Sequence, residues 1–294
     1  MTISKVFVAG AGLMGGGITQ VTAAAGYPVV MRDISAEAVD KAMESIKWSL
    51  DKFASKGKIS AEDVEKAISN ITPTTDVSLA KDADLVIEAV FENLELKKKV
   101  FKELDEIAKP QCILATNTSA ISITKIASAT GRADKVIGMH FFSPVPMMRL
   151  CELIRGLETS DETLGVAEEF VRSIGKEPVI VHKDVAGFIA NRIGLAMTVV
   201  AVKLVEAGVA TPTDIDKAMR LGFGHAMGPC ETADLTGIDV LSHALKAIYE
   251  ETQDERYWPP ELLERMVAAG LLGRKTKKGF YDYSSGDQVA YWKI

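Results

Sequence analysis

The stretch that decides the fold is Lys5–Asp33, KVFVAGAGLMGGGITQVTAAAGYPVVMRD. It begins with KVFVA, an apolar run typical of a buried strand, and Gly10, Gly12 and Gly15 follow in the spacing G-x-G-x-x-G. Gly10 allows a tight turn, Gly12 lets the backbone approach a phosphate, and Gly15 lets the next helix pack closely on the strand. The free N–H groups at the start of that helix would face a pyrophosphate, so the stretch predicts a dinucleotide-binding strand–turn–helix unit.

An acidic residue closes the same stretch. The Ala-rich helix ends at Gly26, a second strand covers Pro28–Arg32, and Asp33 stands eighteen residues after Gly15. A carboxylate in this place accepts hydrogen bonds from an adenosine ribose and repels a 2′-phosphate, which favours NAD over NADP. Arg32 can pair with such a phosphate, so NADP is the alternative cofactor. The plainer interpretation of the glycines alone is a tight turn without a ligand.

Further strand-like runs continue this unit downstream. Short apolar segments cover residues 85–89, 113–116, 136–139, 149–154 and 178–181. Polar residues follow three of these runs, namely Glu92, Ser119 and His140. Because doubly wound sheets bind ligands at the carboxyl ends of their strands, these side chains are expected at one edge of the sheet. The pattern predicts an α/β domain of the doubly wound Rossmann type over residues 1–185.

The remainder of the chain changes character. After residue 185 no strand–helix alternation follows, and the apolar spacing predicts helices over residues 188–207, 212–221, 234–250 and 260–270. Thr211-Pro212-Thr213-Asp214 is a complete helix start, with a cap, a proline at the first position and an acid at the third. We therefore expect a second, all-helical C-terminal domain over residues 186–294.

One histidine and one glutamate stand out in the apolar stretch Val136–Gly156, VIGMHFFSPVPMMRLCELIRG. His140 and Glu152 are costly to bury unless each has a polar partner, and the simplest partner for each is the other. A nicotinamide site suggests hydride transfer, and oxidation of an alcohol also needs a base, for which histidine is suited near neutral pH. His140 is therefore the expected acid/base, and Glu152 the carboxylate that orients its ring. The alternative is a purely structural pair in the core.

Composition excludes several classes of protein. The chain has 294 residues, a net charge of −6 and no basic cluster, which argues against a nucleic-acid partner. The apolar segment 188–209 contains Asn191, Arg192, Lys203 and Glu206, so we expect a buried helix and no membrane span. Three widely spaced cysteines and an N-terminus without signal-peptide features suit a reducing cytoplasm. No His/Cys cluster has metal-ligand spacing, and no GxSxG nucleophile motif is present.

Seven colinear motifs resemble the 3-hydroxyacyl-CoA dehydrogenase family over nearly the whole chain. They are GAGLMG with Asp33, EAVFENLELKKKVF, ATNTSA, GMHFFSPVPMMRLCELI, GKEPV, GFIANRI and KTKKGFYDY. The pattern HFFxPVPxMxLxE is specific to this family, whereas the glycine motif is shared by many dinucleotide-binding proteins. The resemblance is strongest to the single-function members of bacterial length.

This resemblance implies an NAD-binding domain followed by a helical domain that forms a homodimer, with the active site in the cleft between the domains. It implies that His140 and Glu152 are catalytic and that Ser119 and Asn191 contact the substrate. The coenzyme A contacts it implies are Ser45 and Lys52, which lie seven residues apart and share one helix face. The cofactor contacts it implies are Gly10, Ala11, Gly12, Leu13, Met14, Gly15, Asp33, Glu92, Lys97, Ser119, Ser143 and Lys275.

The chain departs from the family pattern in two places. Ser143 stands where the family usually has asparagine, and Ala186-Gly187-Phe188 stands where it usually has Pro-Gly-Phe. The first departure concerns a residue on the nicotinamide side of the expected site. The second, with one extra residue before it, concerns how Asn191 is aimed.

The implied activity is the NAD-dependent interconversion of (S)-3-hydroxyacyl-CoA and 3-oxoacyl-CoA, with 3-hydroxybutyryl-CoA and acetoacetyl-CoA as the expected short-chain pair. Two alternatives stay open. A related β-hydroxyacid dehydrogenase would act on a free acid with a lysine as acid/base, which leaves HFFSPVP and Glu152 unexplained. A non-catalytic NAD-binding protein would keep the fold without turnover.

Overall fold

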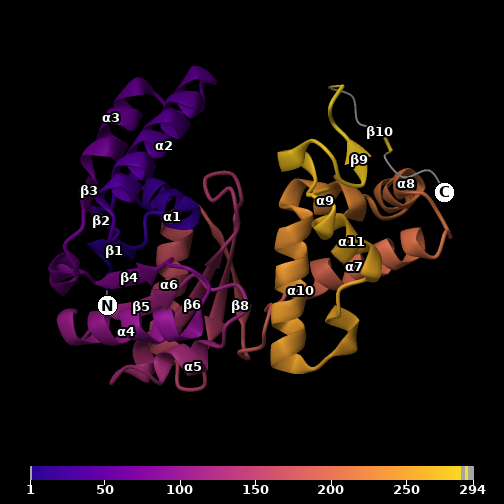
Figure 1. Ribbon diagram of the computed structural model, residues 1–294. Helices are drawn as coiled ribbons and strands as arrows, with labels where there is room; N and C mark the ends of the chain where they lie inside the picture. Colours follow the sequence, from indigo (N-terminus) through magenta and orange to yellow (C-terminus); the bar gives the residue numbers. More distant parts are fainter. Residues whose placement is uncertain (1, 286–288, 291–294) are drawn as a thin grey trace. The chain divides into compact units, whose positions relative to one another are not determined.

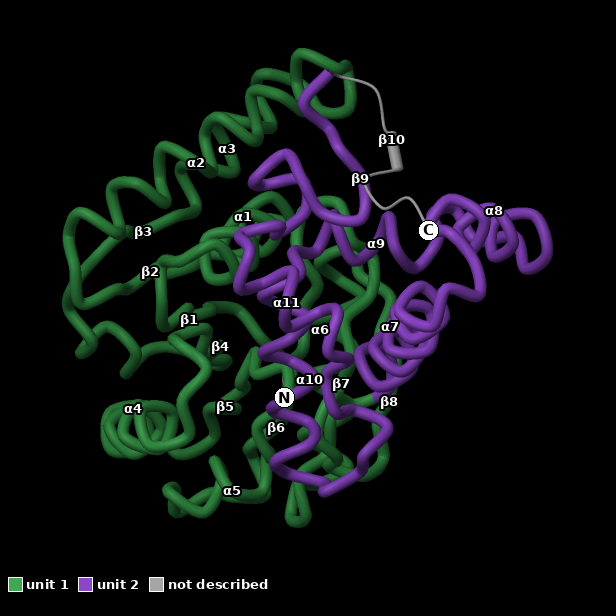
Figure 2. The backbone as a smooth tube through the Cα atoms, turned by 45° about the vertical axis from the view of Figure 1, so that its right-hand side comes forward, with its two compact units in different colours: residues 1–188 green, residues 189–294 purple. Residues whose placement is uncertain are grey.

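In a computed structural model, residues 2–285 and 289–290 of the chain are described. The chain forms two compact units, residues 1–188 and residues 189–294, which Figure 2 draws in green and purple. Among the described residues, no helix is long and apolar enough to cross a membrane.

The first unit is built on an eight-stranded sheet with the strand order β3-β2-β1-β4-β5-β6-β7-β8. Its strands are β1 (Val6–Ala9), β2 (Val29–Arg32), β3 (Ile71–Thr74), β4 (Leu85–Glu88), β5 (Ile113–Thr116), β6 (Val136–Phe141), β7 (Leu150–Arg155) and β8 (Glu177–Val181). Strands β1 to β6 are parallel, whereas β7 pairs with β6 in the antiparallel sense and β8 runs parallel to β7. The predicted doubly wound α/β architecture is confirmed, with an antiparallel pair added at one end.

Helices cover both faces of this sheet, as Figure 1 shows. One face packs against α1 (Leu13–Ala24), α2 (Ala36–Ser55), α3 (Ala61–Ser69) and α6 (Asp161–Ser173). The other packs against α4 (Leu94–Ile107), α5 (Ile123–Ala127) and the short 3₁₀ helix η1 (Val77–Asp82). Successive residues of a strand point to opposite faces, so Val6 and Val8 enter one core and Phe7 and Ala9 the other. A sheet buried on both faces explains why its strands are continuously apolar.

Side-chain caps begin several of these helices where the sequence predicts them. Ser35 accepts a hydrogen bond from the Ala38 amide at the start of α2. Ser60 and Asp63 form a reciprocal capping box at the start of α3. Each such cap satisfies an otherwise unpaired N–H and contributes about 1 kcal/mol.

The second unit is mainly helical. It contains α7 (Ala190–Glu206), α8 (Pro212–Phe223), α9 (Pro229–Thr236), α10 (Ile238–Thr252), α11 (Glu261–Ala268), the 3₁₀ turns η3 (Glu255–Tyr257) and η4 (Arg274–Thr276), and the short ribbon β9 (Tyr281–Asp282) and β10 (Val289–Ala290). Thr211 caps α8 through the Asp214 amide, which confirms the predicted helix start.

Three features differ from the sequence expectations. The second domain was expected to be all-helical, but it also contains the antiparallel ribbon of β9 and β10. Strand β3 was not expected, because it contains Pro73 and buries only Ile71 fully, so it shows no apolar run. The helix expected over residues 234–250 is instead two helices, α9 and α10, separated at Gly237, whose φ is 105°. The spacing of apolar residues does not predict helix α9, because Glu231 and Asp234 are among its buried residues.

The C-terminal motif KTKKGFYDY is explained by the buried carboxylate of Asp234. Asp234 accepts hydrogen bonds from the Phe280 and Tyr281 amides, both at 2.9 Å, and from the Tyr283 hydroxyl at 3.0 Å. A Cβ on Gly279 would lie 2.0 Å from Asp234 Oδ1, so only glycine fits there. Burial raises the pKa of Asp234, although these bonds oppose the shift. The motif is therefore part of the packing of the second unit.

Candidate active site

The centre of the candidate site is a cross-strand pair. In the antiparallel pairing of β6 and β7, His140 lies directly opposite Glu152. His140 Nδ1 and Glu152 Oε2 are 2.8 Å apart, and both side chains are buried. The predicted partnership of these two residues is confirmed. Because Glu152 accepts from Nδ1–H, Nε2 is the ring nitrogen that can exchange a proton with a substrate.

Two aromatic rings lie beside His140, and one side-chain amide bonds to the residue that follows it. The ring centres of Phe142 and Phe188 lie 4.4 and 5.5 Å from that of His140. The Phe141 amide donates to Asn117 Oδ1 at 2.9 Å, which joins the ends of β5 and β6. Asn117 lies in the ATNTSA motif, but its role was not anticipated, because its partner is a backbone group of another strand.

The glycine turn lies at the same edge of the sheet, because β1, β4, β5 and β6 are parallel and neighbouring. A Cβ on Gly10, whose φ is 114°, would lie 2.6 Å from the Ala89 carbonyl oxygen, and one on Gly15 would lie 1.9 Å from the Gly10 carbonyl oxygen. At Gly12, by contrast, a Cβ would meet nothing within 4 Å. Gly10 and Gly15 are needed for close packing, whereas Gly12 leaves open space at the start of α1. This arrangement fits a dinucleotide pyrophosphate.

Asp33 is tied to this turn. Its Oδ2 accepts a hydrogen bond from the Ala11 amide at 2.8 Å, and its Oδ1 accepts one from the Ser35 amide at 3.3 Å. Arg32 Nε donates instead to the Thr75 carbonyl oxygen at 3.3 Å. The carboxylate therefore stands beside the turn where the ribose of NAD is expected, and the neighbouring guanidinium is engaged at the end of β3.

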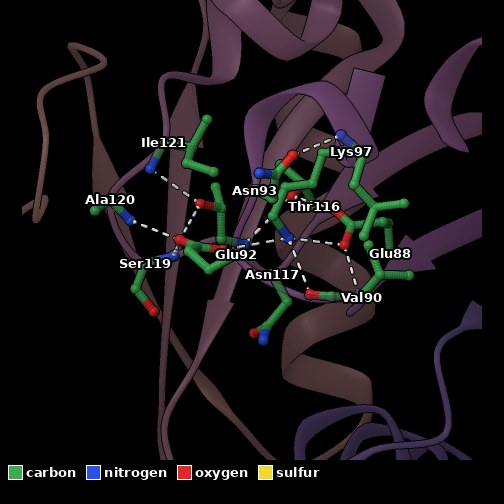
Figure 3. A network of polar contacts seen from close by, with 12 residues as sticks. Glu88, Val90, Glu92, Asn93, Lys97, Thr116, Asn117, Ser119, Ala120 and Ile121 are labelled. Atoms are coloured by element: carbon green, nitrogen blue, oxygen red, sulfur yellow. Dashed lines mark hydrogen bonds and ion pairs between the residues drawn. The ribbon is translucent and has the colours of Figure 1, made fainter. Parts of the chain in front are cut away.

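A polar network connects three of the expected cofactor residues, and Figure 3 shows it. Glu92 Oε1 accepts from the Ser119 amide at 2.8 Å and the Ala120 amide at 3.2 Å. Lys97 Nζ lies 3.3 Å from Glu92 Oε2 and 2.8 Å from Glu88 Oε1. The structure thus brings Glu92, Lys97 and Ser119 together, and it adds Glu88, which sequence reasoning did not single out.

A pocket of about 530 Å³ opens between α1, α2 and residues 144–146. Gly12, Ser45 and Trp48 are among its lining residues. Lys52 Nζ lies 5.5 Å from the centre of the Trp48 ring. The structure therefore places Ser45 in a pocket that reaches the glycine turn, with Lys52 next to one of its walls.

The loop between β6 and β7 carries Ser143 at the surface and forms part of that pocket. Lys176, the lysine of the GKEPV motif, donates to the carbonyl oxygens of Val145 at 2.5 Å and Met148 at 2.8 Å. Burial lowers the pKa of Lys176. Lys176 is thus a third residue whose role the sequence did not reveal, since its partners are backbone carbonyls brought near by the fold.

The remaining expected residues belong to the second unit. Asn191 lies half-buried in the first turn of α7. Lys275 Nζ contacts both carboxylate oxygens of Asp239, at 2.5 and 2.6 Å.

Other reactive side chains offer little alternative chemistry. Within residues 2–285 and 289–290, no group of three or more His, Cys, Asp and Glu residues could hold a metal ion. Cys112, Cys151 and Cys230 are free and buried, and burial raises the pKa of the Cys112 thiol to about 12. A thiol held in its protonated form is a poor nucleophile.

A dinucleotide turn that shares its sheet edge with a buried His–Glu pair defines the class of protein: an NAD-dependent dehydrogenase. Comparison with protein families gives the particular group. The model of the 3-hydroxyacyl-CoA dehydrogenase NAD binding domain matches residues 5–185, and that of the 3-hydroxyacyl-CoA dehydrogenase C-terminal domain matches residues 187–283. The chain belongs to the 3-hydroxyacyl-CoA dehydrogenase family.

Individual relatives match over their full length. A 3-hydroxybutyryl-CoA dehydrogenase of Clostridioides difficile is 46% identical over 280 residues, which cover 95% of this chain and 99% of the relative. The crystal structure of (S)-3-hydroxybutyryl-CoA dehydrogenase PaaH1 from Ralstonia eutropha has a TM-score of 0.92 at 45% identity and covers 96% of this chain and 100% of the other. FadB2 of M. tuberculosis has a TM-score of 0.93 at 40% identity, with 97% and 100% coverage.

Proposed function

We propose that the chain interconverts (S)-3-hydroxybutyryl-CoA and acetoacetyl-CoA with NAD as the hydride carrier, and that His140 moves the proton. The observation that carries this proposal is the 2.8 Å contact between His140 Nδ1 and Glu152 Oε2 in the protein interior. Family membership gives the reaction class, and the names of the similar proteins point to the four-carbon substrate.

Proton transfer is the task of His140. Bound NAD supplies the acceptor or donor of the hydride at C3 of the substrate. In oxidation, His140 Nε2 takes the proton of the C3 hydroxyl, and in reduction the same nitrogen returns a proton to the carbonyl oxygen. Because oxidation releases a proton, the equilibrium moves toward the 3-oxo product as the pH rises.

Glu152 acts on the reaction through the imidazole. It accepts the Nδ1–H bond, so it selects the tautomer that presents Nε2 to the substrate, and its negative charge stabilises the imidazolium. His140 is 3% exposed and Glu152 is 0% exposed, so this bond lies away from water. A low local dielectric strengthens the interaction between carboxylate and imidazolium.

The remaining contacts follow from position. Ser119 and Asn191 would donate to the substrate oxygen, and Ser45 and Lys52 would hold the coenzyme A moiety along α2, where the pocket beside Ser45 supports the assignment. The cofactor would lie on the glycine turn Gly10–Gly15, with its ribose at Asp33. Glu92, Ser143 and Lys275 would complete its contacts, and the carboxylate of Asp33 favours NAD over NADP.

We also propose that residues 1–185 act as the NAD-binding domain and that residues 186–294 act as a substrate and dimerisation domain. We propose the cytoplasm as the location of the protein. An apolar stripe on α7 supports the dimer, since Ile193, Val200 and Leu204 lie on one helix face and are all exposed. Burial of that stripe against a second copy would remove it from water.

The test is a substrate panel that follows NADH absorbance. Acetoacetyl-CoA, longer 3-oxoacyl-CoA thioesters and free acetoacetate are each supplied with NADH and with NADPH. We expect the highest kcat/KM for acetoacetyl-CoA with NADH. Preference for free acetoacetate would establish the β-hydroxyacid alternative, and NADH binding without turnover of any substrate would establish a non-catalytic protein.

A further inference from the structure

Lys97 is a buried cation near the ligand-binding edge of the sheet. Its side chain is 1% exposed, although it lies on α4 among charged residues. Its ammonium group lies 2.8 Å from Glu88 Oε1, 3.3 Å from Glu92 Oε2 and 3.4 Å from the Val90 carbonyl oxygen. Its Nζ donates hydrogen bonds to the oxygens of Glu88 and Val90, and the Glu92 carboxylate faces it as an ion-pair partner. Lys97 therefore acts on protein groups.

Glu88 is the fixed end of this arrangement. It ends β4 and is fully buried. Besides Lys97, its Oε1 accepts from the Val90 amide at 2.7 Å, and its Oε2 accepts from the Thr116 hydroxyl on β5 at 2.7 Å. A buried carboxylate with three polar contacts, to strand β5, helix α4 and the turn after β4, is rigidly held. It anchors the ammonium of Lys97 at the ligand-binding edge of the sheet.

Glu92 is the exposed end. Its side chain is 42% exposed, and its Oε2 faces the ammonium of Lys97. Its Oε1 accepts three hydrogen bonds from the turn after β5, from the Thr118 hydroxyl at 2.5 Å, the Ser119 amide at 2.8 Å and the Ala120 amide at 3.2 Å. The position of Glu92 therefore decides the position of Ser119, and Figure 3 shows both ends of this chain of contacts.

We propose that Glu88 and Lys97 are positioning residues, which hold Glu92 and, through it, the Ser119 turn in the geometry that binds the cofactor and substrate. This inference rests on the proposed function, because it takes Glu92 and Ser119 as contacts of the cofactor and substrate. Lys97 acts on the cofactor site through Glu92. Glu88 acts on the cofactor site through Lys97 and Glu92.

The first experiment separates positioning from simple stability by removing the two buried charges together. Glu88→Gln leaves the buried ammonium of Lys97 with only the partly exposed Glu92, and Lys97→Met leaves Glu88 buried without a cation, so each lowers the melting temperature. The double variant Glu88→Gln/Lys97→Met leaves no such charge, so its melting temperature returns toward that of the wild type. Glu92 still lacks its cation in that variant, and we expect kcat/KM to stay roughly ten- to a hundredfold below wild type.

A matched control lies at the other end of the same strand. Asp84 precedes β4 and pairs with Lys109 at 2.5 Å, far along the strand from the glycine turn. Asp84→Asn/Lys109→Met removes a more exposed ion pair at the opposite end of β4, and kcat/KM should be unchanged. If Glu88→Gln/Lys97→Met regained full activity together with its melting temperature, the pair would be structural only and the proposal would be overturned.

The second experiment tests the route through Glu92 by a double-mutant cycle on the dissociation constant of NADH, measured by fluorescence titration. We expect Lys97→Met to weaken NADH binding about tenfold in the wild-type background and to have no further effect in a Glu92→Ala background. Equal effects in both backgrounds would mean that Lys97 contacts the dinucleotide itself. Because NADH binding needs no acyl-CoA, this result stands even where the proposed substrate proves wrong.

Discussion

Replacement of Glu152 by glutamine tests how the buried pair works. The amide oxygen of glutamine can still accept the His140 Nδ1–H bond, so the ring keeps its place while the negative charge is lost. Opposite unit charges about 4 Å apart attract by about 4 kcal/mol at an effective dielectric constant of about 20. About 1.4 kcal/mol of transition-state stabilisation corresponds to a factor of ten in rate, so the loss of the charge should lower kcat by up to about 10³.

The assay follows NADH oxidation by acetoacetyl-CoA at saturating concentrations, with the dissociation constant of NADH measured in parallel. We expect Glu152→Gln to bind NADH as the wild type does and to lose between about 10² and 10³ in kcat. Glu177→Gln is the matched control, because Glu177 lies on the neighbouring strand β8 and forms an exposed ion pair with Arg149. A Glu152→Gln kcat within threefold of wild type would refute the electrostatic role of Glu152.

Two further predictions concern stability and assembly. Burial works to raise the pKa of Asp84, but the bonds from Lys109 and Ser4 outweigh it and hold the pKa at about 2, below the ordinary value of 3.8. A carboxylate whose pKa is lower in the folded state stabilises the fold at pH values above its unfolded-state pKa, and it loses that contribution as the pH falls. The stability advantage of wild type over Asp84→Asn should therefore shrink by about 2 kcal/mol between pH 5 and pH 2 in urea titrations. A constant difference would contradict this prediction. Val200 is 59% exposed on the α7 stripe, so Val200→Asp should give a monomer by light scattering with an unchanged circular dichroism spectrum, whereas a persisting dimer would place the interface elsewhere.

Much of the fold is predictable from local signals in the sequence. The strand, turn and helix of residues 5–33 are predictable because each step depends on neighbours in sequence, and the helix caps at Ser35, Ser60 and Thr211 are local as well. Strand β3 lacked such signals, and helix α9 has a proline and a capping glutamate at its start but no apolar periodicity. The first buries little at the end of the sheet, and the second buries polar side chains whose partners lie elsewhere in the second unit.

The candidate site shows the same division. The rule that a charged residue in an apolar strand needs a partner predicted the His140–Glu152 contact. The same rule applies to Glu88 within the run LVIEA, and Lys97 follows nine residues later, so this pair was within reach of sequence reasoning. Lys176 was not, because it bonds to the carbonyls of Val145 and Met148, which only the folded loop brings near.

The central claim is that His140 moves the proton, and single-turnover reduction of acetoacetyl-CoA by His140→Gln with bound NADH tests it most directly. Glutamine preserves a polar side chain of similar reach but cannot act as a general acid near neutral pH. We expect the variant to fold, to bind NADH with the wild-type dissociation constant and to reduce the substrate about 10²- to 10⁴-fold more slowly. A single-turnover rate close to that of the wild type would contradict the assignment.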